Sequence, residues 1–319
     1  MINIDKFASI HALVIGDLMI DEYLWGKAEK ISPEAPVPVV SVEKENSTLG
    51  GAGNVIHNLV AMGAAVSAVG TAGKGKAGQM IFHKLEKLGI NTDGIFCEPD
   101  RPTTRKTRVI AANQQVLRID KEIKRKITGA TLIQLKKAID KKITRVNLII
   151  LSDYDKGLIT RDLVSYLVSK TKKQEKPILA DPKSLNFSMY KSVSVLTPNK
   201  KEAGFAAKMD IKTDQDIRTA GEKLIEQLAL ERLLITCGKD GMVLFEKNRK
   251  PFTIESKARQ VFDVSGAGDT VISLLGLGLA VGGSFRESAM VANVAAGIVV
   301  GKVGTATASI DELKQALKK

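Results

Sequence analysis

The stretch Asp263–Thr270, with the sequence DVSGAGDT, combines two features that phosphoryl transfer needs. Gly266, Ala267 and Gly268 precede a helical pattern, and the first N–H groups of a helix have no partners within it, so they can bind an anion. Asp269 lies in the first turn of the same helix. Such amides stabilise charge on a migrating phosphoryl group, while a nearby carboxylate accepts the proton of the attacking hydroxyl. The stretch therefore predicts phosphoryl transfer to an alcohol.

A second glycine-rich segment, with the sequence LGGAGN, ends at Asn54. Gly50, Gly51 and Gly53 permit positive φ angles and a close approach of the backbone to a ligand. Asn54 would lie in the first turn of the helix that follows, where its amide could contact a polyhydroxylated ligand. A tight turn into a helix that Asn54 caps would leave the same pattern, so both interpretations stay open.

The segment from Gly73 to Gly78 formally satisfies GxGxxG, with Asp93 downstream, as in a dinucleotide-binding fold. Shifted to residues 70–77 it nearly spells a P-loop, but Ala77 replaces the Ser or Thr that binds magnesium. The dinucleotide pattern normally opens the first βα unit, whereas this segment follows a strand, a β-rich segment and a helix. We therefore expect an ordinary loop between a strand and a helix.

Strand-length apolar runs alternate with segments of helical period along the chain. The expected strands are 11–16, 65–71, 146–152, 177–181, 195–198 and 232–237; the expected helices are 53–62, 78–88, 128–143, 160–173, 213–230, 268–281 and 285–300, with a short one from Ile310. This alternation predicts an α/β fold with a mainly parallel central sheet and helices on both faces.

Two segments, at about 22–45 and 101–120, alternate instead like antiparallel ribbons. Pro33, Pro36 and Pro38 exclude a helix in the first of them. We expect one domain over residues 1–319 with a small β-rich lid made by these segments, since such flaps often close over active sites. The exposed strand edges of the lid predict a homodimer in which the lids pair.

Composition limits the other classes of function. The chain has 48 Lys and Arg residues against 35 Asp and Glu, a net charge of +13, which favours anionic partners. The lysines are dispersed and aromatic residues make up only 4%, which argues against nucleic-acid binding, although a non-enzymatic anion binder is an alternative class. Two cysteines and three scattered histidines predict no zinc site and no disulfide framework. We expect a cytoplasmic protein without a signal peptide or a membrane span.

These motifs, taken in order, resemble those of the ribokinase-like (PfkB-type) carbohydrate kinases over essentially the whole chain. The resemblance is carried by Gly16-Asp17, the Gly50–Asn54 segment, Thr197-Pro198-Asn199 with Glu202, Thr236 with Gly238 and Gly241, and the segment from Asp263 to Asp269. Their shared order makes coincidence implausible. Many relatives carry an acidic residue where this chain has Lys74-Gly75-Lys76, which leaves the role of that loop open.

Within that family the sequence is similar to the kinases of D-glycero-β-D-manno-heptose 7-phosphate. The segments concerned are GDLMID from Gly16, SPEAPVPV from Ser32, Asn113-Gln114-Gln115, LSDYDKG from Leu151, Asp181-Pro182-Lys183 and VGKVGT from Val300. In many bacteria this kinase is fused to a nucleotidylyltransferase with an HxGH-type signature. No histidine here has that context, so we expect the kinase module alone.

The resemblance implies ATP-dependent phosphorylation of the anomeric hydroxyl, giving the 1,7-bisphosphate for synthesis of the lipopolysaccharide core. Asp269 would accept the hydroxyl proton, and the amides of Gly266, Ala267 and Gly268 would hold the γ-phosphate. The sugar contacts would be Asp17, Gly51 and Asn54, although a turn residue at a strand end would equally account for Asp17. The cations expected near the 7-phosphate are Lys106, Arg108, Lys156 and Lys183, with Lys156 as the strongest candidate.

The resemblance also implies where the nucleotide binds. Asn199 and Glu202 match an NxxE element that organises the Mg²⁺-bound phosphates through water. Thr236, Gly238 and Gly241 match the nucleotide-binding turn; Asn293 would border the adenine, and Asp263 with Ser265 would hold a monovalent cation such as K⁺. The alternative within the fold is another PfkB-type sugar kinase, acting on ribose, fructose 1-phosphate or a nucleoside.

Overall fold

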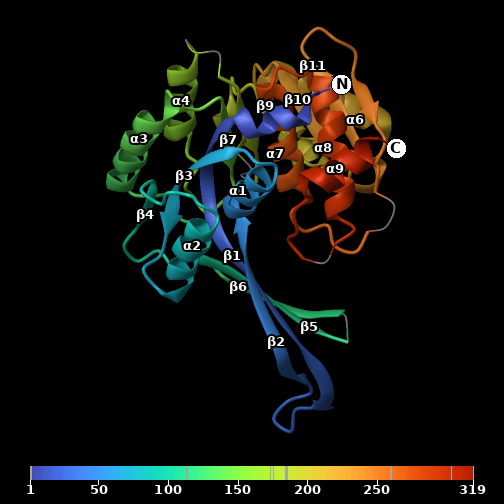
Figure 1. Cartoon of the computed structure of the whole chain (residues 1–319). Coiled ribbons are helices and arrows are strands. Elements are labelled where there is room, and N and C mark those ends of the chain that lie inside the picture. Colours follow the sequence, from blue (N-terminus) through green and yellow to red (C-terminus); the bar gives the residue numbers. More distant parts are fainter. Residues whose placement is uncertain are drawn as a thin grey trace.

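The long first strand, β1 (His11–Ile31), belongs to two sheets at once. The computed structural model describes residues 2–112, 114–172, 174, 176–183, 186–258, 261–302 and 304–318. Asn113 and Val303, which belong to two of the motifs above, lie outside these ranges. The first half of β1 forms the centre of the main sheet, and its second half leaves the body to form a lid (Figure 1).

The main sheet has the strand order β12-β11-β10-β9-β8-β7-β1-β3-β4. The pairs from β4 to β10 are parallel, and only β11 and β12 run antiparallel to their neighbours. The bounds are β3 (Ala65–Ala72), β4 (Ile95–Cys97), β7 (Leu148–Ser152), β8 (Ile178–Asp181), β9 (Val195–Leu196), β10 (Arg232–Thr236), β11 (Met242–Glu246) and β12 (Phe252–Ile254).

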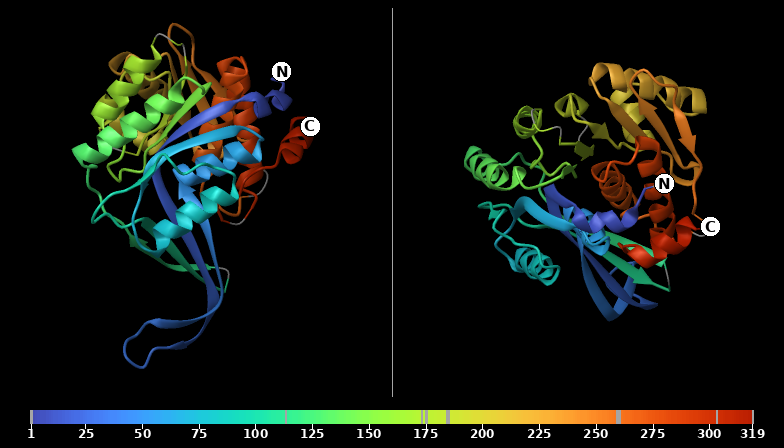
Figure 2. Two further views of the ribbon diagram at one scale, coloured as in Figure 1. Left: turned by 60° about the vertical axis from the view of Figure 1, so that its left-hand side comes forward. Right: turned by 45° about the horizontal axis from the view of Figure 1, so that its top comes forward.

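Helices cover both faces of this sheet (Figure 2). On one face lie α1 (Ala52–Ala61), α2 (Lys76–Lys87), α7 (Ala267–Ala280), α8 (Phe285–Val299) and α9 (Ile310–Leu317). On the other lie α3 (Gly129–Ile143), α4 (Arg161–Thr171), α5 (Lys200–Ala207) and α6 (Asp214–Gln227). Short 3₁₀ helices lie at Ile4–Ser9, Phe187–Tyr190 and Gly238–Asp240.

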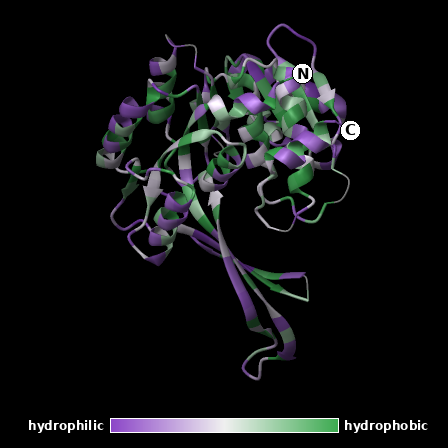
Figure 3. Ribbon diagram, in the orientation of Figure 1, coloured by the Kyte–Doolittle hydropathy of each residue, from purple (hydrophilic) through white to green (hydrophobic). Residues whose placement is uncertain are grey.

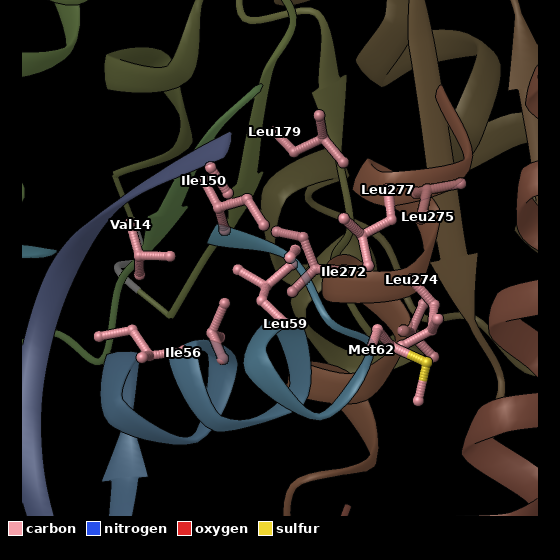
Figure 4. Close-up of a cluster of buried hydrophobic side chains, with 14 of the residues drawn as sticks. Val14, Ile56, Leu59, Met62, Ile150, Leu179, Ile272, Leu274, Leu275 and Leu277 are labelled. Atoms are coloured by element: carbon pink, nitrogen blue, oxygen red, sulfur yellow. The ribbon is translucent and has the colours of Figure 1, made fainter. Parts of the chain in front are cut away.

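Alternate side chains of the strands fill two separate hydrophobic cores. In β1, Val14 belongs to the core under α1 and α7, whereas Leu13 and Ile15 belong to the core under α3 and α4. This alternation follows from the two-residue period of a strand. Figure 4 shows Val14 and Ile150 facing side chains of α1 and α7. The first core therefore fixes α7, whose N-terminus carries Asp269, against the centre of the sheet.

The lid is a four-stranded sheet in the order β2-β1-β5-β6. It contains β2 (Pro38–Gly51), β5 (Thr104–Ala111) and β6 (Gln114–Lys121) beside the second half of β1. Polar and apolar side chains alternate along it, and it projects from the body (Figure 3). Its exposed large apolar side chains are Ile31, Val37, Val42, Val116, Leu117 and Ile119.

The predicted fold class and the predicted lid are confirmed, with differences in detail. The sequence analysis missed β4, β11, β12 and α5, because each is short and gives little periodicity. The Gly73–Gly78 segment joins β3 to α2 as expected, with residues 73–75 in the loop and residues 76–78 in the first turn of α2. Gly73 and Gly78 are required there for close packing: a Cβ on Gly78 would lie 1.7 Å from the Gly73 carbonyl oxygen. Within the described residues, no helix is long and apolar enough to cross a membrane.

Candidate active site

Four buried carboxylates converge at one edge of the main sheet. Asp153 follows β7, Asp181 ends β8, and Asp17 is the last residue of β1 that pairs within the main sheet, so all three lie at the carboxyl edge of its parallel part. Open α/β sheets bind ligands at this edge, because the strand-to-helix loops open there. Asp269, in the first turn of α7, is the fourth.

The N-terminus of α7 has the geometry of an anion-binding turn. Gly266 is the N-cap residue, has a φ of 81° and provides no side-chain cap for the helix. A Cβ at Gly266 would lie 2.5 Å from Asn54 Nδ2, so this position requires glycine. At Gly268 the nearest atom to an added Cβ would be Asp181 Oδ2, at 4.0 Å. The N–H of Ala267 donates to the Val264 carbonyl oxygen over 3.3 Å. The N–H groups of Gly266 and Gly268 have no acceptor among the described residues, so these two amides are open to a ligand beside the carboxylates.

Asp269 is held by one donor on each carboxylate oxygen. Asn54 Nδ2 donates to Oδ2 over 2.8 Å, and the Tyr154 hydroxyl donates to Oδ1 over 2.9 Å. Burial raises the pKa of Asp269 to about 6, while these two hydrogen bonds oppose the increase. The group is thus ionised at neutral pH, yet basic enough to accept a proton from an alcohol.

Asp17 lies inside β1, which continues past it, so the interpretation as a turn residue at a strand end is wrong. Its Oδ2 accepts hydrogen bonds from the backbone N–H groups of Tyr154, at 2.9 Å, and Lys156, at 3.2 Å. Burial, followed by the charge of Asp153, raises the pKa of Asp17 to about 6. The loop after β7 therefore fixes this carboxylate through its backbone.

Asn54 and Gly51 lie where the sequence analysis expected them, at the start of α1. The helix-cap interpretation of Asn54 is wrong, because Gly51 is the N-cap residue and makes no side-chain cap. Asn54 is fully buried and uses its amide on Asp269. Gly51 has a φ of 57°, and a Cβ there would lie 2.5 Å from the Asp17 carbonyl oxygen. These contacts hold the start of α1 next to Asp17 and Asp269.

Three of the four predicted cations lie on the lid side of the site. Lys156 is buried and pairs with Glu122 over 2.9 Å, and Arg108 pairs with Asp21 over 2.6 Å. Lys106 Nζ lies 5.7 Å from the centroid of the Tyr154 ring. Lys106 forms no ion pair with any residue that the structure describes. Burial and the nearby charge of Lys156 lower the pKa of Lys106.

Lys183 is separate from these three cations. Its Nζ pairs with Glu202, and its charge also acts on Asp181. It therefore lies beside the NxxE element, and no contact joins it to the lid cations among the described residues. Burial raises the pKa of Asp181 to about 8, despite the opposing charge of Lys183.

Asn199 and Glu202 form a reciprocal capping box at the start of α5. The Asn199 side chain accepts from the backbone N–H of Glu202 at 3.0 Å, and Glu202 Oε2 accepts from the Asn199 N–H at 2.8 Å. With Oε1 bound by Lys183, both carboxylate oxygens of Glu202 have partners. Among the described residues, no group of three or more His, Cys, Asp or Glu side chains could hold a metal ion. Asn199 and Glu202 would therefore contact a cation bound to a nucleotide only through water molecules.

The other predicted nucleotide residues lie around the end of β10. Thr236 closes this strand and forms a β-bridge with Asn199, which joins the turn to the NxxE element. Gly238 and Gly241 have φ angles of 61° and 88°, and a Cβ on Gly241 would lie 2.0 Å from the Ile254 carbonyl oxygen. The turn after β10 therefore requires glycine at Gly241.

Asn293 and Asp263 have partners within the chain. Asn293 is buried and donates to the carbonyl oxygen of Glu255 over 2.7 Å. Asp263 accepts from the N–H groups of Ser265, at 2.8 Å, and Gly304, at 3.2 Å. Asp263 thus ties the loop before α7 to the segment after α8.

Several residues at the site received no role in the sequence analysis. These are Tyr154, Asp21, Asp153, Asp181 and Glu122. Most belong to motifs that the analysis quoted, namely GDLMID, SDYDKG and ADPK. The motifs were therefore the available signal, but apart from Asp181, which lies two residues from Lys183, these side chains have partners that are far away in sequence.

Comparisons with known proteins identify the family of the chain. The family model described as pfkB family carbohydrate kinase matches residues 9–312. A protein of Desulfatibacillum aliphaticivorans named "Bifunctional protein HldE" is 52% identical over 99% of this chain and 65% of its own length. The chain thus spans about two thirds of this relative.

Solved structures share the fold. Arabidopsis thaliana ribokinase, complexed with ribose and ATP, has a TM-score of 0.76 at 19% identity and covers 97% of this chain and 99% of its own. Phosphofructokinase-2 of Escherichia coli, in complex with potassium, has a TM-score of 0.79 at 17% identity, with 100% and 99% covered. The N-terminus of α7 lies beside Asp269, a carboxylate with a raised pKa, and this arrangement fits the chemistry of an ATP-dependent sugar kinase. The chain belongs to the pfkB family of carbohydrate kinases.

Proposed function

We propose that this chain transfers the γ-phosphoryl group of ATP to the anomeric hydroxyl of D-glycero-β-D-manno-heptose 7-phosphate. The product would be the 1,7-bisphosphate, a precursor of the heptose in the lipopolysaccharide core. The observation that carries the proposal is the position of Asp269, which lies in an anion-binding turn and accepts a hydrogen bond from Tyr154, the residue whose ring lies beneath the Lys106 ammonium. The motif resemblance and the relative named HldE support this choice of sugar.

In this proposal the acidic edge performs the transfer. Asp17 binds sugar hydroxyls, and Asp269 accepts the proton of the anomeric hydroxyl as it attacks. The amides of Gly266, Ala267 and Gly268 stabilise the charge on the migrating phosphoryl group. Asn54 contributes by orienting Asp269, since its amide is already engaged there.

ATP would lie along the turn after β10, near Thr236, Gly238 and Gly241. When bound, Mg²⁺ would neutralise the charge of the β- and γ-phosphates. Asn199 and Glu202 would hold its water ligands, because both oxygens of Glu202 already have partners and Mg²⁺ readily keeps several waters. Lys183, beside Glu202, is better placed for these phosphates than for the sugar. The adenine contact of Asn293 and the K⁺ site at Asp263 and Ser265 stay predictions.

Lys106 is the strongest candidate for the phosphate of the sugar. The other two lid cations already have carboxylate partners, Glu122 for Lys156 and Asp21 for Arg108. Lys106 forms no ion pair with a carboxylate among the described residues, and the charge of Lys156 repels its ammonium. An anion bound between Lys106 and Lys156 would weaken this repulsion. Its attraction to the two ammonium groups would offset the free energy that the anion loses when it leaves water. A phosphorylated acceptor therefore fits this side of the site better than a free sugar.

Two broader proposals accompany this activity. The exposed apolar side chains of the lid, among them Val42, Leu117 and Ile119, favour a homodimer in which two lids pair. Because the reaction would use ATP, we also propose that it takes place in the cytoplasm.

The second candidate is another sugar kinase of this family, acting on ribose, fructose 1-phosphate or a nucleoside. The family match alone is compatible with it. A panel of these acceptors, with phosphorylated and unphosphorylated heptose, assayed with ATP and Mg²⁺, tests the proposal. We expect the highest kcat/KM for heptose 7-phosphate. A higher kcat/KM for the unphosphorylated heptose or for another acceptor would refute the assignment.

A further inference from the structure

Tyr154 contacts both carboxylates that the proposed reaction uses. Its backbone N–H donates to Asp17 Oδ2 over 2.9 Å, and its hydroxyl donates to Asp269 Oδ1 over 2.9 Å. The residue follows β7 in the chain, whereas Asp17 lies on β1 and Asp269 on α7. Tyr154 therefore joins the expected sugar-binding carboxylate to the expected base.

The direction of the hydroxyl hydrogen bond is fixed. Burial, together with the charge of Asp269, raises the pKa of Tyr154 well above its usual range. The phenol therefore keeps its proton wherever Asp269 is ionised. An ionised carboxylate can only accept, so Tyr154 is the donor and Asp269 the acceptor.

Asp269 has a second donor in Asn54, which binds the other carboxylate oxygen. The two donors come from different elements, the loop after β7 and helix α1, so together they fix the rotation of the carboxylate plane. Each oxygen can accept more than one hydrogen bond, so Asp269 can still take a proton from a hydroxyl. The Lys106 ammonium lies over the Tyr154 ring, which brings the lid into the same arrangement.

We propose that Tyr154 is a positioning residue for phosphoryl transfer. It holds the Asp269 carboxylate in the orientation that accepts the sugar proton, and it fixes the position of this carboxylate relative to that of Asp17. The proposal rests on the proposed function where it takes Asp269 as the base. The hydroxyl of Tyr154 acts through Asp269, and its backbone N–H acts through Asp17. A Phe at this position removes the first contact and keeps the second.

The test is Tyr154→Phe, assayed with the acceptor that the wild type phosphorylates. We expect kcat to fall about 10-fold or more, since a hydrogen bond to a charged group is lost. The KM for the sugar should hardly change, because the backbone contact to Asp17 remains. The acid limb of the kcat/KM profile should move to higher pH, since a carboxylate that loses a donor holds its proton more tightly.

Tyr190→Phe is the matched control. Tyr190 is fully buried, and its hydroxyl donates to the carboxylate of Asp153, a pair similar to that of Tyr154 and Asp269. The control loses a buried hydroxyl of the same kind without touching Asp269. We expect it to lower the thermal midpoint and to leave the pKa of Asp269 unchanged, because the hydroxyl that it removes binds Asp153 and not Asp269.

Titration of the ¹³C-labelled carboxyl of Asp269, assigned with Asp269→Asn, reads the same shift without any substrate. If the wild type phosphorylates no heptose phosphate, the proposed function fails, whereas the titration still tests Tyr154. A higher pKa of Asp269 in Tyr154→Phe, but not in Tyr190→Phe, supports the proposal. An unchanged pKa and kcat in Tyr154→Phe, or equal shifts in both variants, would overturn it.

Discussion

The acidic edge of the main sheet and the cations of the lid face the same site, but they are built differently. Asp17, Asp181 and Asp269 are buried on elements of the main body, and backbone or amide donors orient Asp17 and Asp269. Lys106 and Arg108 lie on β5, in the sheet that projects from that body. Figure 1 shows this separation of body and lid. We infer that the acidic edge holds the sugar hydroxyls through Asp17 and performs the transfer through Asp269, whereas the lid recognises the phosphate of the acceptor.

The two regions also differ in how burial changes their charges. At the edge, burial raises the pKa of carboxylates, as for Asp269, which makes a proton acceptor. On the lid, burial and the charge of Lys156 lower the pKa of Lys106, because they destabilise its ammonium; a bound anion would stabilise that ammonium. The comparison predicts that variants of Asp269 lose turnover, whereas variants of the lid cations lose affinity for the phosphorylated acceptor.

The largest effect is expected for Asp269→Asn. The variant keeps the shape and part of the hydrogen bonding of the carboxylate but cannot accept the proton, so kcat should fall by about 10²–10⁴-fold. ATP affinity, measured by calorimetry, should stay near the wild-type value. Asp216→Asn is the matched control, because Asp216 is also the third residue of a 14-residue helix but is only half-buried and takes part in a capping box. The control should lose stability only. More than a tenth of wild-type turnover in Asp269→Asn, an arbitrary threshold, would remove Asp269 from the role of base.

Lys106→Met should have the next largest effect, on the KM for the phosphorylated sugar. Loss of a hydrogen bond to a charged group costs about 1.5–3 kcal/mol, so the KM should rise roughly 10- to 150-fold. ATP affinity should hardly change. The control is Arg105→Met, since neighbouring residues of a strand point to opposite faces of the sheet. Equal increases for phosphorylated and unphosphorylated sugar would contradict a phosphate contact.

The pH dependence of kcat/KM should reflect protonation of the carboxylates at the edge of the main sheet. Because the pKa of Asp269 is about 6, kcat/KM should fall as the pH drops through about 6, where the base becomes protonated. Asp17, also with a pKa of about 6, should steepen this acid limb. A profile that stays flat down to pH 5 would contradict a buried aspartate as the base.

The smallest effect concerns stability and Asp181, whose pKa burial raises to about 8. The folded state then binds this proton more tightly than the unfolded state, in which the pKa is near 3.8. Asp181 therefore stabilises the fold below the unfolded pKa, and this contribution is lost as the pH rises towards about 8. Denaturant unfolding of Asp181→Asn should give a free energy that depends less on pH over this range. Exposed Asp210→Asn is the control and should leave the dependence unchanged.

The sequence was sufficient for the parts of the site that depend on local structure. Gly266 to Asp269 form a turn and a helix start within a few residues, and Asn199 with Glu202 is a local capping box. The contacts of Lys156 with Glu122 and of Tyr154 with Asp269 could not be predicted in this way. They join residues 34 and 115 positions apart, and only the packing of lid, loop and helix brings them together.

Identification of the product tests the central claim most directly. Wild-type protein would be incubated with ATP, Mg²⁺ and heptose 7-phosphate, and the products followed by ³¹P NMR. We expect a new signal of an anomeric phosphate, coupled to the proton on C1, beside the unchanged signal of the 7-phosphate, with ADP formed in equal amount. Formation of ADP and free phosphate without this signal, or a new phosphate on another hydroxyl, would contradict the account.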